Sequence, residues 1–177
     1  MSSVNLSPTS YVVLGLVALF GESTPYDLKR RVAGTIGHFW SFPHSQLYSE
    51  PARLAGLGLL EETREQDGRR KRVYRITDAG RSALAEWLRA PVAEARQIRD
   101  PGLLKLFFGG LAEPGDVVSL AQAQTKSHRR RLEQYRSFER AADPPPGWAH
   151  PLATLQLGKL YEQAAIEFWQ QVAADPP

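Results

Sequence analysis

The chain of 177 residues contains no cysteine, so disulfide bonds, thiolate nucleophiles and cysteine-ligated zinc sites are excluded. It also has no glycine-rich phosphate loop, no Gly-x-Ser-x-Gly turn and no cluster of histidine and carboxylate residues at ligand spacing. His38 and His44 in particular lack the spacing that two metal ligands need on one helix face. We therefore expect no metal site, no cofactor and no enzymatic activity.

Long apolar runs are missing as well. The longest one, Tyr11 to Phe20, has ten residues, whereas about 20 are needed to cross a bilayer. No lysine or arginine precedes this run, and the first basic residue is Lys29, so a secretory signal is not expected either. The fractions of hydrophobic residues, 42%, and charged residues, 23%, are typical of a globular protein. We predict a cytoplasmic protein without membrane contact.

Two pairs of a hydroxyl residue and a proline predict where the first helices begin. Ser7-Pro8 predicts a helix to about Phe20, because serine caps the first turn and proline is favoured at the first helical position. Thr24-Pro25 predicts a second helix in the same way. Its apolar stripe consists of Leu28, Val32 and Ile36. A third helix is predicted from Ser41 or Phe42 to about Leu57, with these inward positions: Leu47, Leu54 and Leu57.

A β-hairpin follows the third helix. Leu59–Arg64 and Lys71–Thr77 have strand patterns, and the turn Gln66-Asp67-Gly68 between them is a strong hairpin signal, because glycine adopts positive φ without steric cost. Three helices and a hairpin make a winged helix-turn-helix. A fourth helix is predicted to begin at Thr77 or Asp78, with Leu84, Trp87 and Leu88 on one face.

The second half is helical by pattern, with helices predicted at Leu103–Leu111, Asp116–Ala141 and Pro151–Ala174. The segment Asp143–Gly147 contains three consecutive prolines and is predicted to connect the last two. The predicted fold class is mainly α. Residues 1–92 form a winged helix-turn-helix DNA-binding domain with a two-stranded wing, and residues 93–177 form an all-α dimerisation domain.

The third helix is the candidate for DNA recognition, because the second helix of a helix-turn-helix enters the major groove. Gln46 suits the N7 and N6 edge of adenine, whereas the other polar side chains suit phosphates or bases. The candidate set is Ser45, Gln46, Tyr48, Ser49 and Arg53. The alternative interpretation is a solvated helix face.

The hairpin carries a concentration of positive charge, with six basic residues against two acidic ones between Arg64 and Arg75. The cations at its tip are predicted to bind phosphates or a minor groove. They are Arg69, Arg70, Lys71 and Arg72. A solvated loop is one alternative. Another is a winged helix that serves only as a protein-interaction module, since that fold is also used in this way.

The last helix has an apolar stripe that is wider than one neighbouring helix within the subunit requires. We predict a homodimer interface at Leu157, Leu160, Tyr161, Ala164, Phe168 and Val172, while packing within the subunit is the alternative. Trp87 and Trp169 are candidates for an effector pocket, or else plain core residues. Exposed helix surface, or else a second DNA contact, is expected at Lys126, His128, Arg129, Arg130, Arg131 and Arg136.

In these motifs the chain resembles the PadR family of transcriptional regulators, in the group with a helical C-terminal domain. The N-terminal motifs are Ser45-Gln46-Leu47-Tyr48, Arg53-Leu54 with Gly56-Leu57-Gly58-Leu59-Leu60, and Arg72-Val73-Tyr74-Arg75-Ile76-Thr77 with Gly80. The C-terminal ones are Leu104-Lys105-Leu106-Phe107-Phe108-Gly109-Gly110 and the helix from Tyr161 to Trp169. The resemblance implies a dimeric, usually repressing regulator whose last helix mediates dimerisation and whose effectors loosen DNA binding.

One residue departs from the family pattern. Pro51 stands where a helix-forming residue is usual, and an interior proline removes a backbone hydrogen bond and costs ~3 kcal/mol. We expect a kink there. The predicted function is a sequence-specific regulator of transcription that binds a palindromic operator in double-stranded DNA and is released by a small-molecule or other effector. A MarR-like regulator is the alternative within this class, although such chains usually have more helical material before the winged helix.

Overall fold

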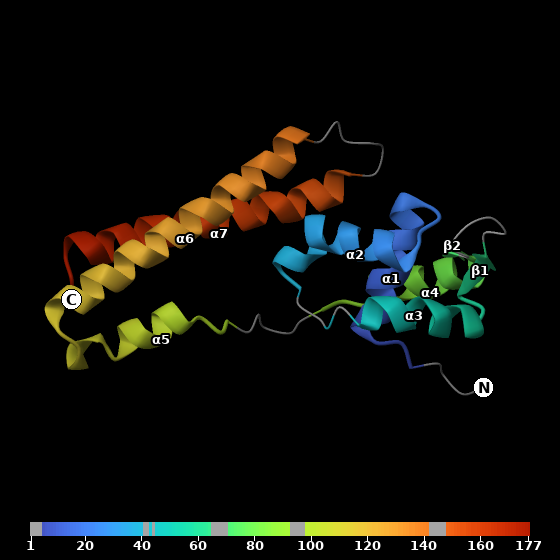
Figure 1. The fold of residues 1–177 in the computed structure, drawn as a ribbon, viewed down its shortest axis with the longest axis horizontal. Coiled ribbons are helices and arrows are strands. Elements are labelled where there is room, and N and C mark those ends of the chain that lie inside the picture. Colours follow the sequence, from blue (N-terminus) through green and yellow to red (C-terminus); the bar gives the residue numbers. More distant parts are fainter. Residues whose placement is uncertain (1–4, 41–42, 44, 65–70, 93–97, 142–147) are drawn as a thin grey trace. The chain divides into compact units, whose positions relative to one another are not determined.

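The computed structural model describes residues 5–40, 43, 45–64, 71–92, 98–141 and 148–177 (Figure 1). It divides into two compact units, residues 1–93 and 94–177, and each unit is described by itself. The N-terminal unit contains, in chain order, α1 (Pro8–Phe20), α2 (Pro25–Gly34), the 3-10 helix η1 (Ile36–His38), α3 (Gln46–Gly56), β1 (Leu60–Arg64), β2 (Arg72–Ile76) and α4 (Asp78–Arg89).

The first two helices begin where the hydroxyl and proline pairs predict. The Ser7 hydroxyl accepts the backbone N–H of Ser10, and the Ser10 hydroxyl accepts the backbone N–H of Ser7 at 2.9 Å, which completes a capping box. Thr24 and Asp27 cap α2 in the same reciprocal way. These local hydrogen bonds satisfy backbone donors that the first turn of a helix cannot pair.

The core of the N-terminal unit lies between α1, α2, α3 and the hairpin. The fully buried members include Val13, Leu14, Leu28, Leu47, Leu54 and Tyr74. The predicted inward position of Leu57 is wrong, since this residue follows the last residue of α3 and remains 39% exposed. The chain turns there, and Gly58 has a φ of 72°, a conformation that favours glycine.

The predicted start of the third helix at Ser41 or Phe42 is also wrong. α3 begins at Gln46, and Pro43 is not helical. A proline lacks the backbone donor of an interior helix position and disfavours helical geometry in the residue before it. α3 continues through Pro51, whose ring is buried, and the expected kink stays a prediction.

The two strands pair antiparallel, from Leu60 opposite Ile76 to Arg64 opposite Arg72. Ser23 adds a short bridge to the other edge of β2, where its backbone exchanges hydrogen bonds with Tyr74 at 3.0 and 2.9 Å. The predicted turn at Asp67-Gly68 lies outside the described residues.

Gly80, in the first turn of α4, packs against the chain that enters β1. A Cβ on this residue would lie 2.1 Å from the Leu59 carbonyl oxygen. Only glycine therefore fits this contact without a shift of the backbone.

The C-terminal unit is entirely helical in its described part. It contains α5 (Pro101–Phe107), the 3-10 helix η2 (Gly109–Leu111), α6 (Pro114–Ala141) and α7 (Ala149–Ala174). α6 and α7 lie side by side (Figure 1), and buried residues between them include Val117, Ala121, Trp169 and Val172. Within the described ranges, every helix is too short or too polar to span a bilayer.

Candidate nucleic-acid interface

The candidate recognition helix has one buried and one exposed face. Leu47, Pro51 and Leu54 are buried in the core. The predicted DNA-contacting side chains lie on the other face, and all of them are exposed: Ser45, Gln46, Tyr48, Ser49 and Arg53. The structure thus brings this predicted set together on one face of α3, with Ser45 directly before its first residue.

The first turn of α1 holds two polar side chains of α3. The Thr9 hydroxyl donates to Gln46 Oε1 at 2.8 Å, and the Ser10 hydroxyl donates to Glu50 Oε1 at 2.6 Å. Thr9 and Ser10 are themselves buried. Sequence reasoning missed both contacts, although two hydroxyl residues at the start of an otherwise apolar helix were a signal that the helix has polar partners.

Arg53 is bound by Glu50 of its own helix and by Ser10 of α1. Its Nε donates to Glu50 Oε2 at 2.9 Å, and its Nη2 donates to Glu50 Oε1 at 2.7 Å and to the Ser10 hydroxyl at 3.0 Å. The hydrogen bonds from Arg53, opposed by burial and reinforced by that from Ser10, hold the pKa of Glu50 below its ordinary value. Glu50 is therefore ionised near neutral pH. Its carboxylate compensates the positive charge of Arg53, which was predicted to contact DNA.

The hairpin cations are compensated in a similar way. Glu62 Oε1 lies 3.2 Å from Arg64 Nε and 3.6 Å from Arg72 Nε, and its Oε2 accepts the Tyr74 hydroxyl at 3.0 Å. Arg75 pairs with the neighbouring Glu61 at 2.5 Å. Of the predicted wing residues, Lys71 and Arg72 are exposed, whereas Arg69 and Arg70 lie outside the described residues. In the described part of the hairpin, Lys71 is the basic residue without an ion pair.

The two tryptophans proposed for an effector pocket lie in different units. Trp87 stacks on Tyr11, with ring centroids 4.7 Å apart and an interplanar angle of 8°, and stays partly exposed. Trp169 is 1% exposed and fills the core between α6 and α7, with Phe168 edge-on beside it. Its prediction as a pocket residue is therefore corrected, because the indole is part of the buried cluster that also contains Val117 and Ala121.

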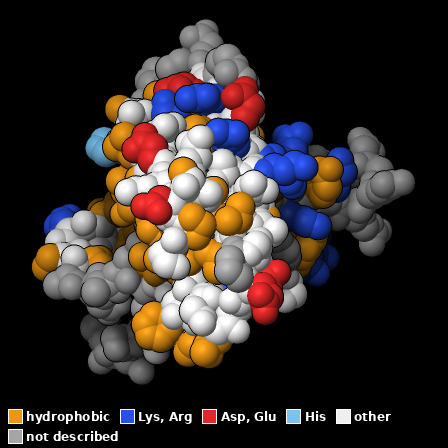
Figure 2. All heavy atoms as spheres, turned by 90° about the vertical axis from the view of Figure 1, so that its left-hand side faces the viewer, with side chains coloured by type: hydrophobic (Ala, Val, Ile, Leu, Met, Phe, Trp, Pro, Cys, Tyr) orange, Lys and Arg blue, Asp and Glu red, His pale blue; other side chains and the backbone are white. Residues whose placement is uncertain are grey.

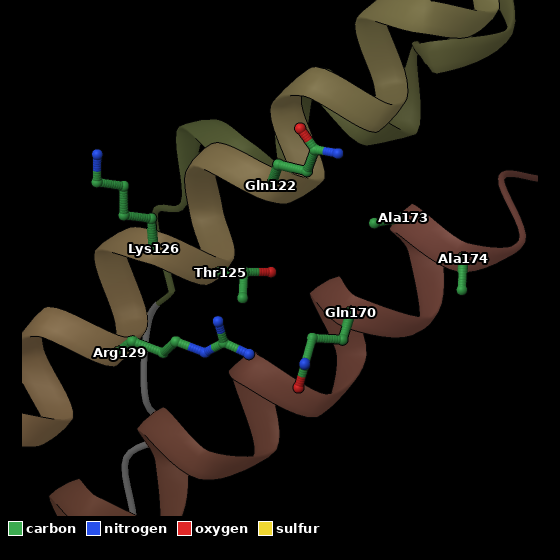
Figure 3. A pocket seen from close by; sticks show the side chains of 7 residues that line it. All are labelled: Gln122, Thr125, Lys126, Arg129, Gln170, Ala173 and Ala174. Atoms are coloured by element: carbon green, nitrogen blue, oxygen red, sulfur yellow. The ribbon is translucent and has the colours of Figure 1, made fainter.

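The C-terminal unit has a hollow of about 610 Å³ between its two long helices. In Figure 3, Arg129 on α6 and Gln170 on α7 point toward each other, whereas Lys126 points away from α7. Neither of the two predicted pocket tryptophans lines this hollow. In the part of the chain that the structure describes, no group of His, Asp and Glu residues has a geometry that could hold a metal ion.

One predicted surface residue of α6 is a partly buried partner of α7 instead. His128 Nδ1 lies 2.6 Å from Oε2 of Glu162, which is buried on α7, and Arg131 Nη1 lies 3.4 Å from Oε1 of the same carboxylate. The interpretation of His128 as exposed helix surface is therefore wrong. A buried carboxylate is costly without partners, and these two contacts provide them while they join the two helices.

The last helix presents most of its predicted interface to solvent. Within the subunit, exposed side chains of this stripe are Leu157, Leu160, Tyr161, Ala164 and Phe168. Val172 is different, because it is only 7% exposed and packs beside Trp169 in the core of the subunit. The prediction of Val172 as an interface residue is therefore corrected.

A second apolar surface was missed by sequence reasoning. The segment from α5 through η2 exposes Leu103, Leu104, Phe107, Phe108 and Leu111. The signal was present, since a seven-residue helix cannot bury leucine and phenylalanine on every side against a single neighbour. Figure 2 shows hydrophobic patches on the face of the C-terminal unit that is turned to the viewer. Contiguous apolar surface of this kind marks interaction sites in soluble proteins.

The chain matches two family models. Residues 13–86 match the "Transcriptional regulator PadR-like family", and residues 98–175 match the "Virulence activator alpha C-term". The "Probable transcriptional regulator Rv1176c" of Mycobacterium tuberculosis is 30% identical over 167 residues, which cover 85% of this chain and 88% of that protein. The "Negative transcriptional regulator PadR" of Bacillus subtilis is 28% identical over 148 residues, 80% of each chain.

Solved structures agree with these matches. Bacillus subtilis PadR in complex with operator DNA has a TM-score of 0.83 and 24% identity, and covers 95% of this chain and 98% of its own. The same protein with p-coumaric acid has a TM-score of 0.76 and 25% identity, with 93% and 96% covered. The Vibrio cholerae virulence activator AphA has a TM-score of 0.71 and 27% identity, with 94% and 96% covered. The predicted fold class is confirmed, and the relatives are regulators, not enzymes.

Proposed function

The chain belongs to the PadR-like family of transcriptional regulators, and we propose that it is a homodimeric repressor that binds a palindromic operator. The MarR-like alternative is set aside by this membership. Repression is supported by the name of the Bacillus subtilis relative, a negative transcriptional regulator, and operator binding by the complex of that protein with its operator. The observation that carries the proposal is the exposed polar face of α3 beside a basic hairpin.

In the proposed complex, α3 lies in the major groove with Gln46 on the edge of a base. An amide side chain pairs well with adenine, since it can donate to N7 and accept from N6 at the same time. Ser45, Tyr48 and Ser49 contact phosphates or neighbouring bases. Arg53 contacts the backbone while its other edge stays on Glu50, so it acts as a positioned donor more than as a free charge.

The hairpin contributes backbone contacts. Lys71 and Arg72 are exposed on the start of β2, and Arg69 and Arg70 precede them in the chain. Clustered basic residues bind phosphates and release condensed counterions, which adds affinity without direct sequence information. Sequence preference is therefore assigned to α3 and general affinity to the hairpin.

Dimerisation is assigned to the exposed apolar face of α7. The exposed residues of this face, which a second copy would cover, are Leu157, Leu160, Tyr161, Ala164 and Phe168. α5 adds further apolar surface. A two-fold symmetric dimer places two copies of α3 on two half-sites, which is why a palindromic operator is expected.

Release by a small molecule is supported by the complex of Bacillus subtilis PadR with p-coumaric acid. For this chain we propose a small-molecule effector that weakens DNA binding. The half-exposed Trp87 ring, stacked on Tyr11, stays a candidate for contact with it.

Selection of bound fragments from genomic DNA tests the function. We expect fragments that share one palindromic sequence, and Gln46→Ala should cost ~1–3 kcal/mol on that sequence but little on random DNA. Failure to enrich any sequence would favour the protein-interaction module instead. Equal losses on both DNAs would show that Gln46 does not determine sequence preference, and a reporter gene behind the selected operator measures the sign of regulation.

A further inference from the structure

The side chain proposed to contact a base is already held in the free protein. Gln46 is exposed at the start of α3, yet its Oε1 accepts a hydrogen bond of 2.8 Å from the hydroxyl of Thr9. Thr9 is 7% exposed and lies on α1. We propose that Thr9 is a positioning residue for base recognition, which fixes the Gln46 amide before DNA binds. The inference rests on the role given to Gln46 above.

Thr9 is suited to this task because its donor has little freedom. A β-branched side chain in a helix has one torsion and few rotamers, and burial within the unit restricts it further. Glutamine has three torsions and samples many positions when it is unrestrained. The hydrogen bond from the fixed Thr9 hydroxyl therefore restricts the Gln46 amide to one position.

The contact leaves the chemistry of recognition intact. A glutamine amide has two acceptor lone pairs on Oε1 and two protons on Nε2. Thr9 uses one lone pair, and in the described part of the chain Nε2 has no hydrogen-bond partner. One lone pair and both protons remain, which is enough for the two hydrogen bonds of a glutamine and adenine pair.

A second pair of contacts fixes the same two helices one turn further along. The Ser10 hydroxyl donates a hydrogen bond to Glu50 Oε1 at 2.6 Å and accepts one from Arg53 Nη2 at 3.0 Å. The first turn of α1 and the first half of α3 thus form one polar junction, beside the apolar core that also joins them. Because of this junction, a change at Thr9 releases the amide of Gln46 without releasing α3 itself.

The size of the effect follows from side-chain ordering. Immobilising one rotamer-rich side chain on binding weakens an interaction by roughly 2- to 12-fold. Thr9 removes this cost by ordering Gln46 in advance. Thr9→Val keeps the shape and removes the donor, whereas Thr9→Ser keeps the donor. Gln46 is exposed, so water replaces the lost hydrogen bond in Thr9→Val and the unfolding temperature should change little.

The test uses a duplex selected by the protein from a random library, together with duplexes that each carry one changed base pair. Wild type, Gln46→Ala, Thr9→Val, Thr9→Ser and the double variant of Thr9→Val with Gln46→Ala are titrated on all of them. We expect Gln46→Ala to lose discrimination at one base pair. Thr9→Val should lower the same discrimination by roughly 2- to 12-fold, Thr9→Ser should stay near wild type, and Thr9→Val should add nothing when Gln46 is already alanine.

The other outcomes separate the two claims. If Gln46→Ala keeps full discrimination at every base pair, the role of Gln46 is wrong and that of Thr9 is overturned with it. If Gln46→Ala loses discrimination and Thr9→Val does not, Thr9 has no positioning role, while the proposed function stands. If Thr9→Val weakens selected and scrambled duplexes equally, or lowers the unfolding temperature as Thr9→Ser does, its effect is on folding and the inference is overturned.

Discussion

Leu160→Ala should weaken the proposed dimer about 100-fold. Leu160 is 58% exposed on α7 in the single subunit, so a partner has most of this side chain left to cover. The substitution removes three carbons worth about 0.8 kcal/mol each when buried, and scaling by that exposed fraction of 58% gives about 1.4 kcal/mol per subunit. A symmetric interface contains the residue twice. The loss of about 2.8 kcal/mol per dimer corresponds to two factors of ten in the dissociation constant.

Sedimentation velocity over a range of protein concentrations measures this constant, and two matched variants of the same helix serve as controls. Gln163→Ala changes an exposed polar residue of α7 outside the apolar stripe and should leave dimerisation unchanged. Val172→Ala removes carbon from the core of the subunit, so its loss should appear as a lower unfolding temperature. The reasoning is refuted if wild type is monomeric at micromolar concentration, or if Leu160→Ala and Gln163→Ala dissociate alike.

Three further predictions concern the N-terminal unit. Changing Arg70 and Lys71 together to alanine removes up to four phosphate contacts per dimer, so the slope of log affinity against log salt should become shallower by at most about 4. Titrations at three salt concentrations measure this slope. An unchanged slope would mean that the hairpin does not contact DNA. The lowered pKa of Glu50 means that its ion pair stabilises the fold above its ordinary pKa and is lost as pH falls through the lowered value. Thermal unfolding from neutral to acid pH should therefore show a loss of stability that Glu50→Gln lacks, and identical pH profiles would contradict this. Gly80→Ala should lower the free energy of unfolding by about 1–3 kcal/mol or more, because the new Cβ meets a backbone carbonyl. Gly34→Ala is the control, since its Cβ meets nothing within 4 Å and should not lower this free energy. Denaturant titrations measure both, and equal losses would show that the contact at Gly80 does not determine stability.

The helix starts could be predicted from the sequence because their causes are local. Ser7 and Thr24 cap residues three positions away, and the proline after each one fixes its own φ. The alternation in β2 likewise shows directly which side faces the core, and Tyr74 is indeed buried. Apolar periodicity alone predicts too early a start for α3, because it takes no account of Pro43, which disfavours helical geometry in the residue before it.

The electrostatics of the site could not be predicted in this way, because each partner comes from another element. Glu61 and Glu62 lie in β1 and compensate cations in β2 that are ten or more residues away along the chain. The contacts of Thr9 and Gln46 span 37 residues. The division of the α7 stripe has the same origin, since only the packing of α7 on α6 decides that Val172 is buried and Leu160 exposed.

In the proposed function, these compensated charges would make dimerisation a condition for tight DNA binding. Arg53, Arg72 and Arg75 each have a carboxylate partner in the free subunit, so fewer of their charges are available to phosphates than the sequence suggests. One subunit should then bind DNA weakly, because phosphate contacts supply most of the general affinity. Joining two subunits turns the second half-site contact into an intramolecular step and raises the affinity by 10²–10⁴ without a new contact, an order-of-magnitude effect of linkage. A variant that only weakens the α7 interface, such as Leu160→Ala, should therefore lose operator affinity at low protein concentration and regain it when the concentration exceeds its dimer dissociation constant.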